Sequence, residues 1–225
     1  MKVCVIQTDN RPTLDYLLKT QAVNRKFCQQ LGYDYEFIPM EEAKYPACHP
    51  ATRKIYVVSE WLQSAPYDVM VFLDSDAWVQ NPAHLHTIVT ELYETATKQG
   101  CISRDPYKKH NTYINSGGFI LKVNDYNRHM YHELIQALAT NPKFHYKWPF
   151  DQHYISEYIF QHKDDFIVFR PIILNKPNGQ VIRHNWPKNA QMHADLDAIL
   201  SGSTVVAQEP FAWDWALDVG GYPNN

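Results

Sequence analysis

Strand-like and helix-like spacings of apolar residues alternate through the first third of the chain. Three stretches are typical of β-strands: Val3 to Thr8, Tyr33 to Ile38 and Val69 to Leu73. Between them, apolar side chains recur at helical spacing, first at Leu14, Leu17, Leu18, Phe27 and Leu31 and then at Ile55, Val58, Trp61 and Leu62. Gly32 is placed to end the first of these helices. The βαβαβ order predicts an α/β fold.

The second half of the chain continues the same alternation. Strands are expected near Phe119 to Val123, Phe166 to Phe169 and Val181 to His184, and helices near Tyr126 to Ala139 and Phe150 to Phe160. No repeat or low-complexity linker divides the sequence. With 225 residues, of which 45% are hydrophobic, the chain is long enough to bury a core. We therefore expect residues 1–225 to form a single domain.

Composition narrows the classes of partner. The net charge is −3 and no block of Lys or Arg stands out, which argues against a nucleic-acid partner. No apolar run approaches the length of a transmembrane segment or of a signal-peptide core, so a soluble, cytoplasmic protein is expected. The cysteines are scattered, without the paired spacing of metal sites, which favours reduced thiols: Cys4, Cys28, Cys48 and Cys101.

The strongest chemical signal is the pair of carboxylates at Asp74 and Asp76, directly after the apolar run Val69 to Leu73. A spacing of two residues sends both acids toward the same side as the strand ends. Carboxylate oxygens suit Mg²⁺ or Mn²⁺, and these ions often bind substrate phosphates. The alternative is an ordinary solvated turn, because Asp and Ser are common turn residues.

Other candidates lie at expected element ends. Thr8 and Asp9 end the first strand, and open α/β sheets bind ligands at the carboxyl edge of their strands. Lys54 opens the helix before the acidic pair and offers a cation to a diphosphate, although a solvated helix face explains it equally well. Small residues at Asn115-Ser116-Gly117-Gly118 permit close approach of a sugar, or form a plain tight turn.

The last candidates are polar residues beside aromatic ones. Asp151 and Gln152 follow Trp148-Pro149-Phe150 and offer hydrogen bonds to sugar hydroxyls, whereas Asp151 as a simple helix cap is the alternative. His184 ends the strand Val181 to His184, and Asn185-Trp186-Pro187-Lys188 follows it. A single histidine among eleven is more often structural than a ligand, so its position is what recommends His184.

In order along the chain, these segments resemble the nucleotide-sugar-dependent glycosyltransferases of the GT-A fold, particularly the α-galactosyl, α-mannosyl and α-xylosyltransferase family. The matching segments are Asn24-Arg25-Lys26 through Leu31-Gly32-Tyr33, Lys54, Phe72 to Asp76 with Asn81-Pro82, Asn115-Ser116-Gly117, Asp151-Gln152 and His184. The sequence departs from the family in lacking an anchor and stem and in carrying Asn185-Trp186 where relatives often have Gly. Compact, anchorless members occur in bacteria and in large viruses of algae.

The resemblance implies a Rossmann-like domain with a central mixed, mostly parallel sheet flanked by helices. It implies that Asp76 and His184 bind a metal, with Asp74 as a further ligand or a contact to the ribose. Mn²⁺ is favoured over Mg²⁺ because imidazole suits the softer ion. The implied donor is a nucleoside diphosphate sugar, with UDP favoured, and the implied acceptor is a glycan hydroxyl.

The remaining site residues follow from the same resemblance. The residues expected to contact the nucleotide are Thr8, Asp9, Lys54, Ser75 and Lys188. Those expected to contact the substrate are Asn115, Ser116, Gly117 and Trp186, and the expected catalytic residues are Asp151 and Gln152. The family favours retention at the anomeric carbon. Asp151 is nevertheless placed where an inverting enzyme would use a general base, so the stereochemical outcome stays open.

Two alternatives come from other functional classes. An aspartyl phosphotransferase of the haloacid dehalogenase type also places an acid pair after a strand, and Lys163-Asp164-Asp165 would supply its later acids. The late position of the strand and Trp78 behind the pair argue against it. A non-catalytic sugar-binding module is supported only by the six Trp and fifteen Tyr, which more often serve as core residues.

Overall fold

The computed structural model describes residues 1–106, 113–203 and 216–217. Within these ranges the strands of the main sheet are β1 (Val3–Asp9), β2 (Asp34–Pro39), β3 (Val69–Leu73), β5 (Gly100–Arg104), β6 (Ile114–Lys122), β7 (Phe166–Phe169) and β9 (Ala216–Leu217). Their order across the sheet is β2-β1-β3-β6-β5-β7-β9. A second, two-stranded sheet pairs β4 (Ala77–Val79) with β8 (Ile182–His184).

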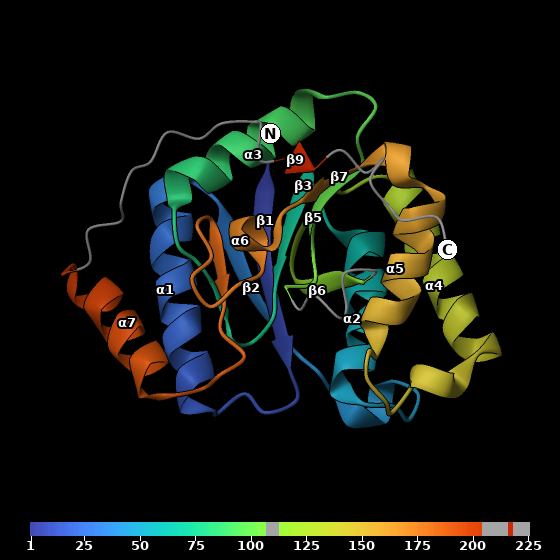
Figure 1. Ribbon diagram of the computed structural model, residues 1–225, viewed down its shortest axis with the longest axis horizontal. Helices are drawn as coiled ribbons and strands as arrows, with labels where there is room; N and C mark the ends of the chain where they lie inside the picture. Colours follow the sequence, from blue (N-terminus) through green and yellow to red (C-terminus); the bar gives the residue numbers. More distant parts are fainter. Residues whose placement is uncertain (107–112, 204–215, 218–225) are drawn as a thin grey trace.

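Helices cover both faces of the main sheet (Figure 1). The α-helices are α1 (Asp15–Leu31), α2 (Pro50–Ser64), α3 (Pro82–Glu94), α4 (Asp125–Thr140), α5 (Asp151–Gln161), α6 (Pro171–Leu174) and α7 (Ala190–Ser201). Short 3₁₀ turns are η1 (Glu42–Lys44), η3 (Pro142–Phe144) and η4 (Lys163–Asp165). One apolar cluster joins the sheet to α1, α3 and α7, and the other joins it to α2, α4 and α5. Because both faces are covered, every residue of β1 and β3 is buried.

The sheet is mixed and mostly parallel, as predicted. β1 runs parallel to β2 and β3, and β5 runs parallel to β7. β6 runs antiparallel to both β3 and β5, and β9 is antiparallel to β7. Five of the seven described strands of this sheet, β1, β2, β3, β5 and β7, therefore run in one direction, and β6 and β9 oppose them. β5 and β6 are consecutive strands, and antiparallel neighbours need no crossover helix.

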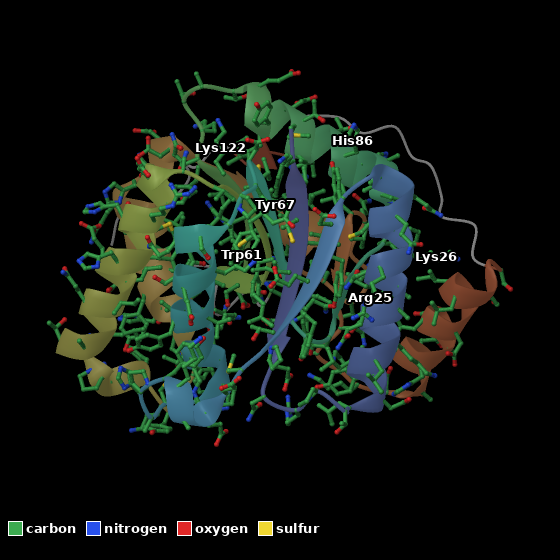
Figure 2. All side chains as sticks on the ribbon, turned by 180° about the vertical axis from the view of Figure 1, so that it is seen from behind. Arg25, Lys26, Trp61, Tyr67, His86 and Lys122 are labelled. Atoms are coloured by element: carbon green, nitrogen blue, oxygen red, sulfur yellow. The ribbon has the colours of Figure 1, made fainter. Side chains whose placement is uncertain are left out.

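Local sequence explains the helix ends. Gly32 adopts φ 68°, a left-handed conformation that ends α1 where the sequence predicted. Pro50 and Pro82 occupy first turns, where the missing N–H leaves no helical hydrogen bond unmade. Lys26, on the outer part of α1, donates to the carbonyl of Ile199 at 2.6 Å and ties α7 to α1 (Figure 2).

The alternative of a tight turn at Asn115 to Gly118 is wrong. These residues belong to β6, which begins at Ile114, and all of them are buried. A Gly-Gly pair in a central strand indicates close approach by other atoms rather than a turn. The sequence also did not predict β4 and β5, both of which are short.

Two further features concern the helices and the cysteines. Within the described ranges, no helix is both long and apolar enough to cross a membrane. Cys4, Cys28, Cys48 and Cys101 are all buried free thiols. Burial raises the pKa of Cys4 and of Cys28 to about 12, so both thiols stay protonated and unreactive near neutral pH.

Candidate functional site

Asp74 and Asp76 lie in the turn between β3 and β4, at the carboxyl edge of the main sheet. Buried amides from β1 and α1 hold this turn. Gln7 donates to the carbonyls of Asp74 at 2.9 Å and Ala77 at 3.2 Å, and Asn24 accepts from the Val79 N–H at 2.9 Å. Because these buried polar groups are paired, the turn has a fixed shape and both carboxylates are positioned.

The pairing of β8 with β4 brings His184 to the acids. Ala77 lies opposite His184 in this antiparallel ladder, and the Asn185 N–H donates to the Asp76 carbonyl at 2.9 Å. The His184 Nε2 atom is 3.2 Å from Asp76 Oδ1 and 3.7 Å from Asp74 Oδ2. Three candidate ligand atoms therefore converge from two segments far apart in the sequence.

Asn115 fixes the orientation of the imidazole. Its Oδ1 accepts from the Gly117 N–H at 2.9 Å and lies 3.2 Å from His184 Nδ1. A carbonyl oxygen only accepts, so Nδ1 carries a proton and Nε2 is the ring nitrogen that faces the two acids. Such outer hydrogen bonds set the tautomer of metal-binding histidines.

Gly117 gives His184 room. A Cβ atom at residue 117 would lie 2.1 Å from the imidazole ring, closer than any real side-chain contact. The backbone of β6 therefore forms the floor on which the ring lies. This contact explains why a glycine occupies the interior of a buried strand.

Replacing Gly117 with Ala is expected to displace the imidazole and weaken Mn²⁺ binding by roughly tenfold to a hundredfold, the usual effect of disturbing groups that orient a metal ligand. Titration of Mn²⁺ followed by electron paramagnetic resonance measures this directly. Gly202→Ala is the control: its φ of 77° strains any side chain at the end of α7, so the substitution costs stability but should leave Mn²⁺ affinity unchanged. Equal Mn²⁺ affinity in wild type and Gly117→Ala would remove His184 from the metal site.

Two lysines bind the carboxylate oxygens of Asp74 and Asp76 that point away from His184. Lys54 donates to Asp74 Oδ1 at 2.9 Å, and Lys188 pairs with Asp76 Oδ2. The other oxygen of each carboxylate faces His184 Nε2. Burial alone would raise the pKa of Asp76, but His184 and Lys188 hold that pKa well below its usual range. Asp76 is therefore a carboxylate at any physiological pH.

The donor set fits a divalent cation. One atom each from Asp74, Asp76 and His184 lies within 4.8 Å of the others. Burial opposes the charged form of His184, but the nearby carboxylate of Asp76 raises its pKa, so the ring already sits in a field that attracts a cation. Mixed carboxylate and imidazole ligands suit Mn²⁺ and related ions.

A pocket of about 220 Å³ opens over these residues. Eight of the predicted site residues line it together: Thr8, Asp9, Lys54, Asp74, Ser75, Asp76, His184 and Lys188. The sequence interpretation missed five others, namely Arg11, Met40, His49, Pro50 and Ala51. The proline at the start of α2 was a usable signal for the last three, since it marks a helix N-terminus near the sheet edge.

The other predicted residues lie behind or beside this pocket. Asp151 is buried at the start of α5 and lies 3.1 Å from Lys54 Nζ. Gln152 donates to Asp105 Oδ2 at 3.1 Å and to the Ile114 carbonyl at 2.8 Å. Ser116 accepts from Lys54 at 3.1 Å, and Trp186 lines a separate hollow.

Comparison with known proteins identifies the fold. No protein-family model matches the sequence, and no curated protein matches it. A glycosyltransferase involved in the glycosylation of the major capsid of PBCV-1 superposes with a TM-score of 0.70 at 16% identity, covering 88% of this chain and 100% of its own. The glycosyltransferase GlyE of Streptococcus pneumoniae TIGR4 gives a TM-score of 0.54 at 12% identity, covering 90% of this chain and 63% of its own. The chain therefore has a glycosyltransferase fold of the GT-A kind, as predicted.

Proposed function

We propose that this protein is a metal-dependent glycosyltransferase that moves a hexose or pentose from a nucleoside diphosphate sugar, with UDP favoured, to a hydroxyl of a glycan. The observation that carries the proposal is the convergence of Asp74, Asp76 and His184 at the mouth of one pocket. The glycosyltransferase fold supports it, because the pocket lies at the sheet edge where α/β folds bind nucleotides.

Charge balance supports a metal requirement. Three carboxylates line the pocket, and they are matched by three cations: Arg11, Lys54 and Lys188. Because the charges in the pocket cancel, it attracts a diphosphate only weakly. A bound divalent ion would make the net charge of the pocket positive, and the pocket would then attract anions. Asp74, Asp76 and His184 would hold Mn²⁺ or Mg²⁺, which when bound supplies a Lewis acid that neutralises the departing diphosphate.

Other residues of the pocket would contact the phosphates, the ribose and the base of the donor. Lys188 reaches the pocket from the loop after β8, where its ammonium is placed for a phosphate oxygen. The N-terminus of α2, at Pro50 and Ala51, adds the positive end of a helix dipole to the same pocket. Thr8 and Asp9 end β1 beside it and would contact the ribose or base.

Asp151 and Gln152 would contact the transferred sugar. The buried Asp151 carboxyl pairs with Lys54, and Lys54 also pairs with Asp74. Lys54 therefore links Asp151 to the turn that carries Asp74 and Asp76, called the acid turn below. Burial raises the pKa of Asp151, an effect that Lys54 only partly offsets. A carboxyl group with a raised pKa is suited to exchanging a proton with a sugar hydroxyl.

The phosphotransferase alternative has little geometric support. Its later acids, Asp164 and Asp165, precede β7, which runs in the same direction as β3 through the pairings of β5 and β6. They therefore lie at the amino edge of the sheet, opposite Asp74. A phosphotransferase needs its acids together around one phosphoryl group.

Binding of UDP in the presence of Mn²⁺ tests the proposal. We expect UDP to raise the melting temperature with Mn²⁺ and to have little effect with EDTA, because the ion joins ligand to protein. Binding to the native state at a hundred times Kd contributes about 2.7 kcal/mol. Differential scanning fluorimetry over a matrix of ligand and metal measures the shift.

GDP and ADP serve as matched nucleotide controls in the same experiment. A larger shift with GDP would change the donor while leaving the metal site in place. No shift with any nucleoside diphosphate, with or without metal, would contradict the proposed function. Release of UDP from a UDP-sugar in the presence of Mn²⁺ then distinguishes an enzyme from a sugar-binding module.

A further inference from the structure

A second hollow of about 440 Å³ lies beside the first pocket. It is formed by the segment after α6, the end of β8, the loop that follows β8 and the first turn of α7. Its lining combines one indole, four amide groups and two cations, completed by Pro106, Pro177 and Pro187: Trp186, Asn178, Asn185, Asn189, Gln191, Arg183 and Lys176. Its volume falls within the roughly 300–1,000 Å³ of typical small-molecule sites.

The two hollows share one short segment as a common wall. His184 and Lys188 line the first pocket, whereas the three residues between them, Asn185, Trp186 and Pro187, line the second. The Trp186 ring stands edge-on to the His184 ring, with centroids 5.4 Å apart at 83°. A molecule in the second hollow would therefore lie one side chain away from the proposed metal ligand.

The wall of the second hollow is rigid. Arg183 pairs with Asp195 at 2.8 Å, donates to the Pro177 carbonyl at 2.6 Å and stacks 4.7 Å from the Trp78 ring. The Asn185 amide donates to the Pro187 carbonyl at 2.6 Å, which braces the loop. A preformed site loses little conformational entropy on binding.

The chemistry of the lining favours a hydroxyl-rich ring. An indole presents an apolar face, and amide groups both donate to and accept from hydroxyls. None of the described residues that line the hollow carries a carboxylate; of its two cations, Arg183 is matched by Asp195, and Lys176 adds a further donor for hydroxyls. Arg11, Lys54 and Lys188 line the other pocket together with the candidate metal ligands, so the diphosphate of the donor is expected there.

We propose that this second hollow binds the sugar acceptor, with a pyranose ring against Trp186. The inference rests on the proposed function, since it assigns the second substrate of the same reaction. In this arrangement the Trp186 side of the shared wall selects the acceptor, and the His184 side holds the donor. Acceptor preference would then change with residues of the β8 to α7 loop, without change to the acid pair.

Binding of simple glycosides tests the assignment without relying on turnover. Protein with Mn²⁺ and UDP is titrated with the methyl pyranosides of glucose, galactose, mannose and xylose, and binding is followed by saturation-transfer difference NMR. We expect at least one glycoside to bind wild type, and its affinity to fall at least tenfold in Trp186→Ala. Gln191→Trp is a second variant at an exposed position, where the added ring would fill the hollow without disturbing the core.

Trp148→Ala is the matched control, because Trp148 is also partly exposed, at 44%, yet does not line the hollow. It should keep wild-type glycoside affinity. Undiminished binding in both Trp186→Ala and Gln191→Trp, a loss confined to Trp148→Ala, or no glycoside binding by wild type would each overturn the assignment. The UDP and Mn²⁺ shift of wild type is measured separately, so failure of the donor site is distinguishable from failure of the acceptor site.

Discussion

Replacing Asp76 with Asn is expected to lower Mn²⁺-dependent release of UDP from a UDP-sugar by roughly 10²- to 10³-fold, the usual effect of losing one preorganised electrostatic contact in a transition state. Asp76 is buried between His184 and Lys188, so the change removes an anionic ligand, leaves the Lys188 ammonium without its carboxylate partner and takes away the negative charge that faces His184. Steady-state kinetics, together with Mn²⁺ titration by electron paramagnetic resonance, measures both consequences.

Asp125→Asn is the control for this change. Asp125 is fully exposed at the start of α4, where it pairs with Arg128, and its replacement should alter neither Mn²⁺ affinity nor rate. The melting temperature of Asp76→Asn separates chemistry from folding. A rate within tenfold of wild type would show that the acid turn is structural, whatever the metal affinity.

Replacing Lys54 with Met is expected to destabilise the protein by roughly 3–5 kcal/mol, because removing one partner of a buried ion pair leaves charge buried without compensation. Burial alone would lower the pKa of Lys54, but Asp151 and Asp74 raise it, so the ammonium is charged in the native state. For a chain of this size the melting temperature should fall by roughly 6–20 °C. Thermal unfolding monitored by circular dichroism measures the change.

Two comparisons make this prediction specific. Lys44→Met removes an exposed pair with Glu60 and should change the stability by no more than about 1 kcal/mol. Burial raises the pKa of Asp151, so lowering the pH in Lys54→Met protonates that carboxyl and removes the unpaired charge. The deficit relative to wild type should therefore shrink at acidic pH. A deficit that is constant with pH would mean that Lys54 contributes only by packing.

The sequence predicted the parts of the fold that periodicity controls. The strands Val3 to Thr8 and Val69 to Leu73 agree with β1 and β3 to within one residue, and Gly32 ends α1 as expected. The acid pair was found because carboxylates after a buried strand break the apolar pattern. Its meeting with His184 in space followed from family resemblance, since spacing along the chain carries no information on long-range pairing.

The supports of the site were beyond prediction. Gln7 only interrupts an apolar strand, and Asn24 belongs to a segment that matches the glycosyltransferase family without a role being assigned to it, yet both hold the turn that carries Asp74 and Asp76. Asn115 and Gly117 were interpreted as substrate contacts or as part of a plain tight turn, and their place in β6 against His184 was not predicted. Such contacts depend on which strands become neighbours, and that arrangement is set by tertiary packing.

The short ladder between β4 and β8 also has a consequence for the order in which the chain is expected to fold. Lys188 and Asp76 are 112 residues apart in sequence, and this ladder is one of the contacts that bring their segments together. Closing so long a loop is costly until non-local strands pair, so the late segment docks after the first half of the sheet has formed. A chain that ends before β8 would contain Asp74 and Asp76 but would lack His184. Full affinity of the proposed site for a metal ion would therefore require that β8 has been synthesised and has paired with β4.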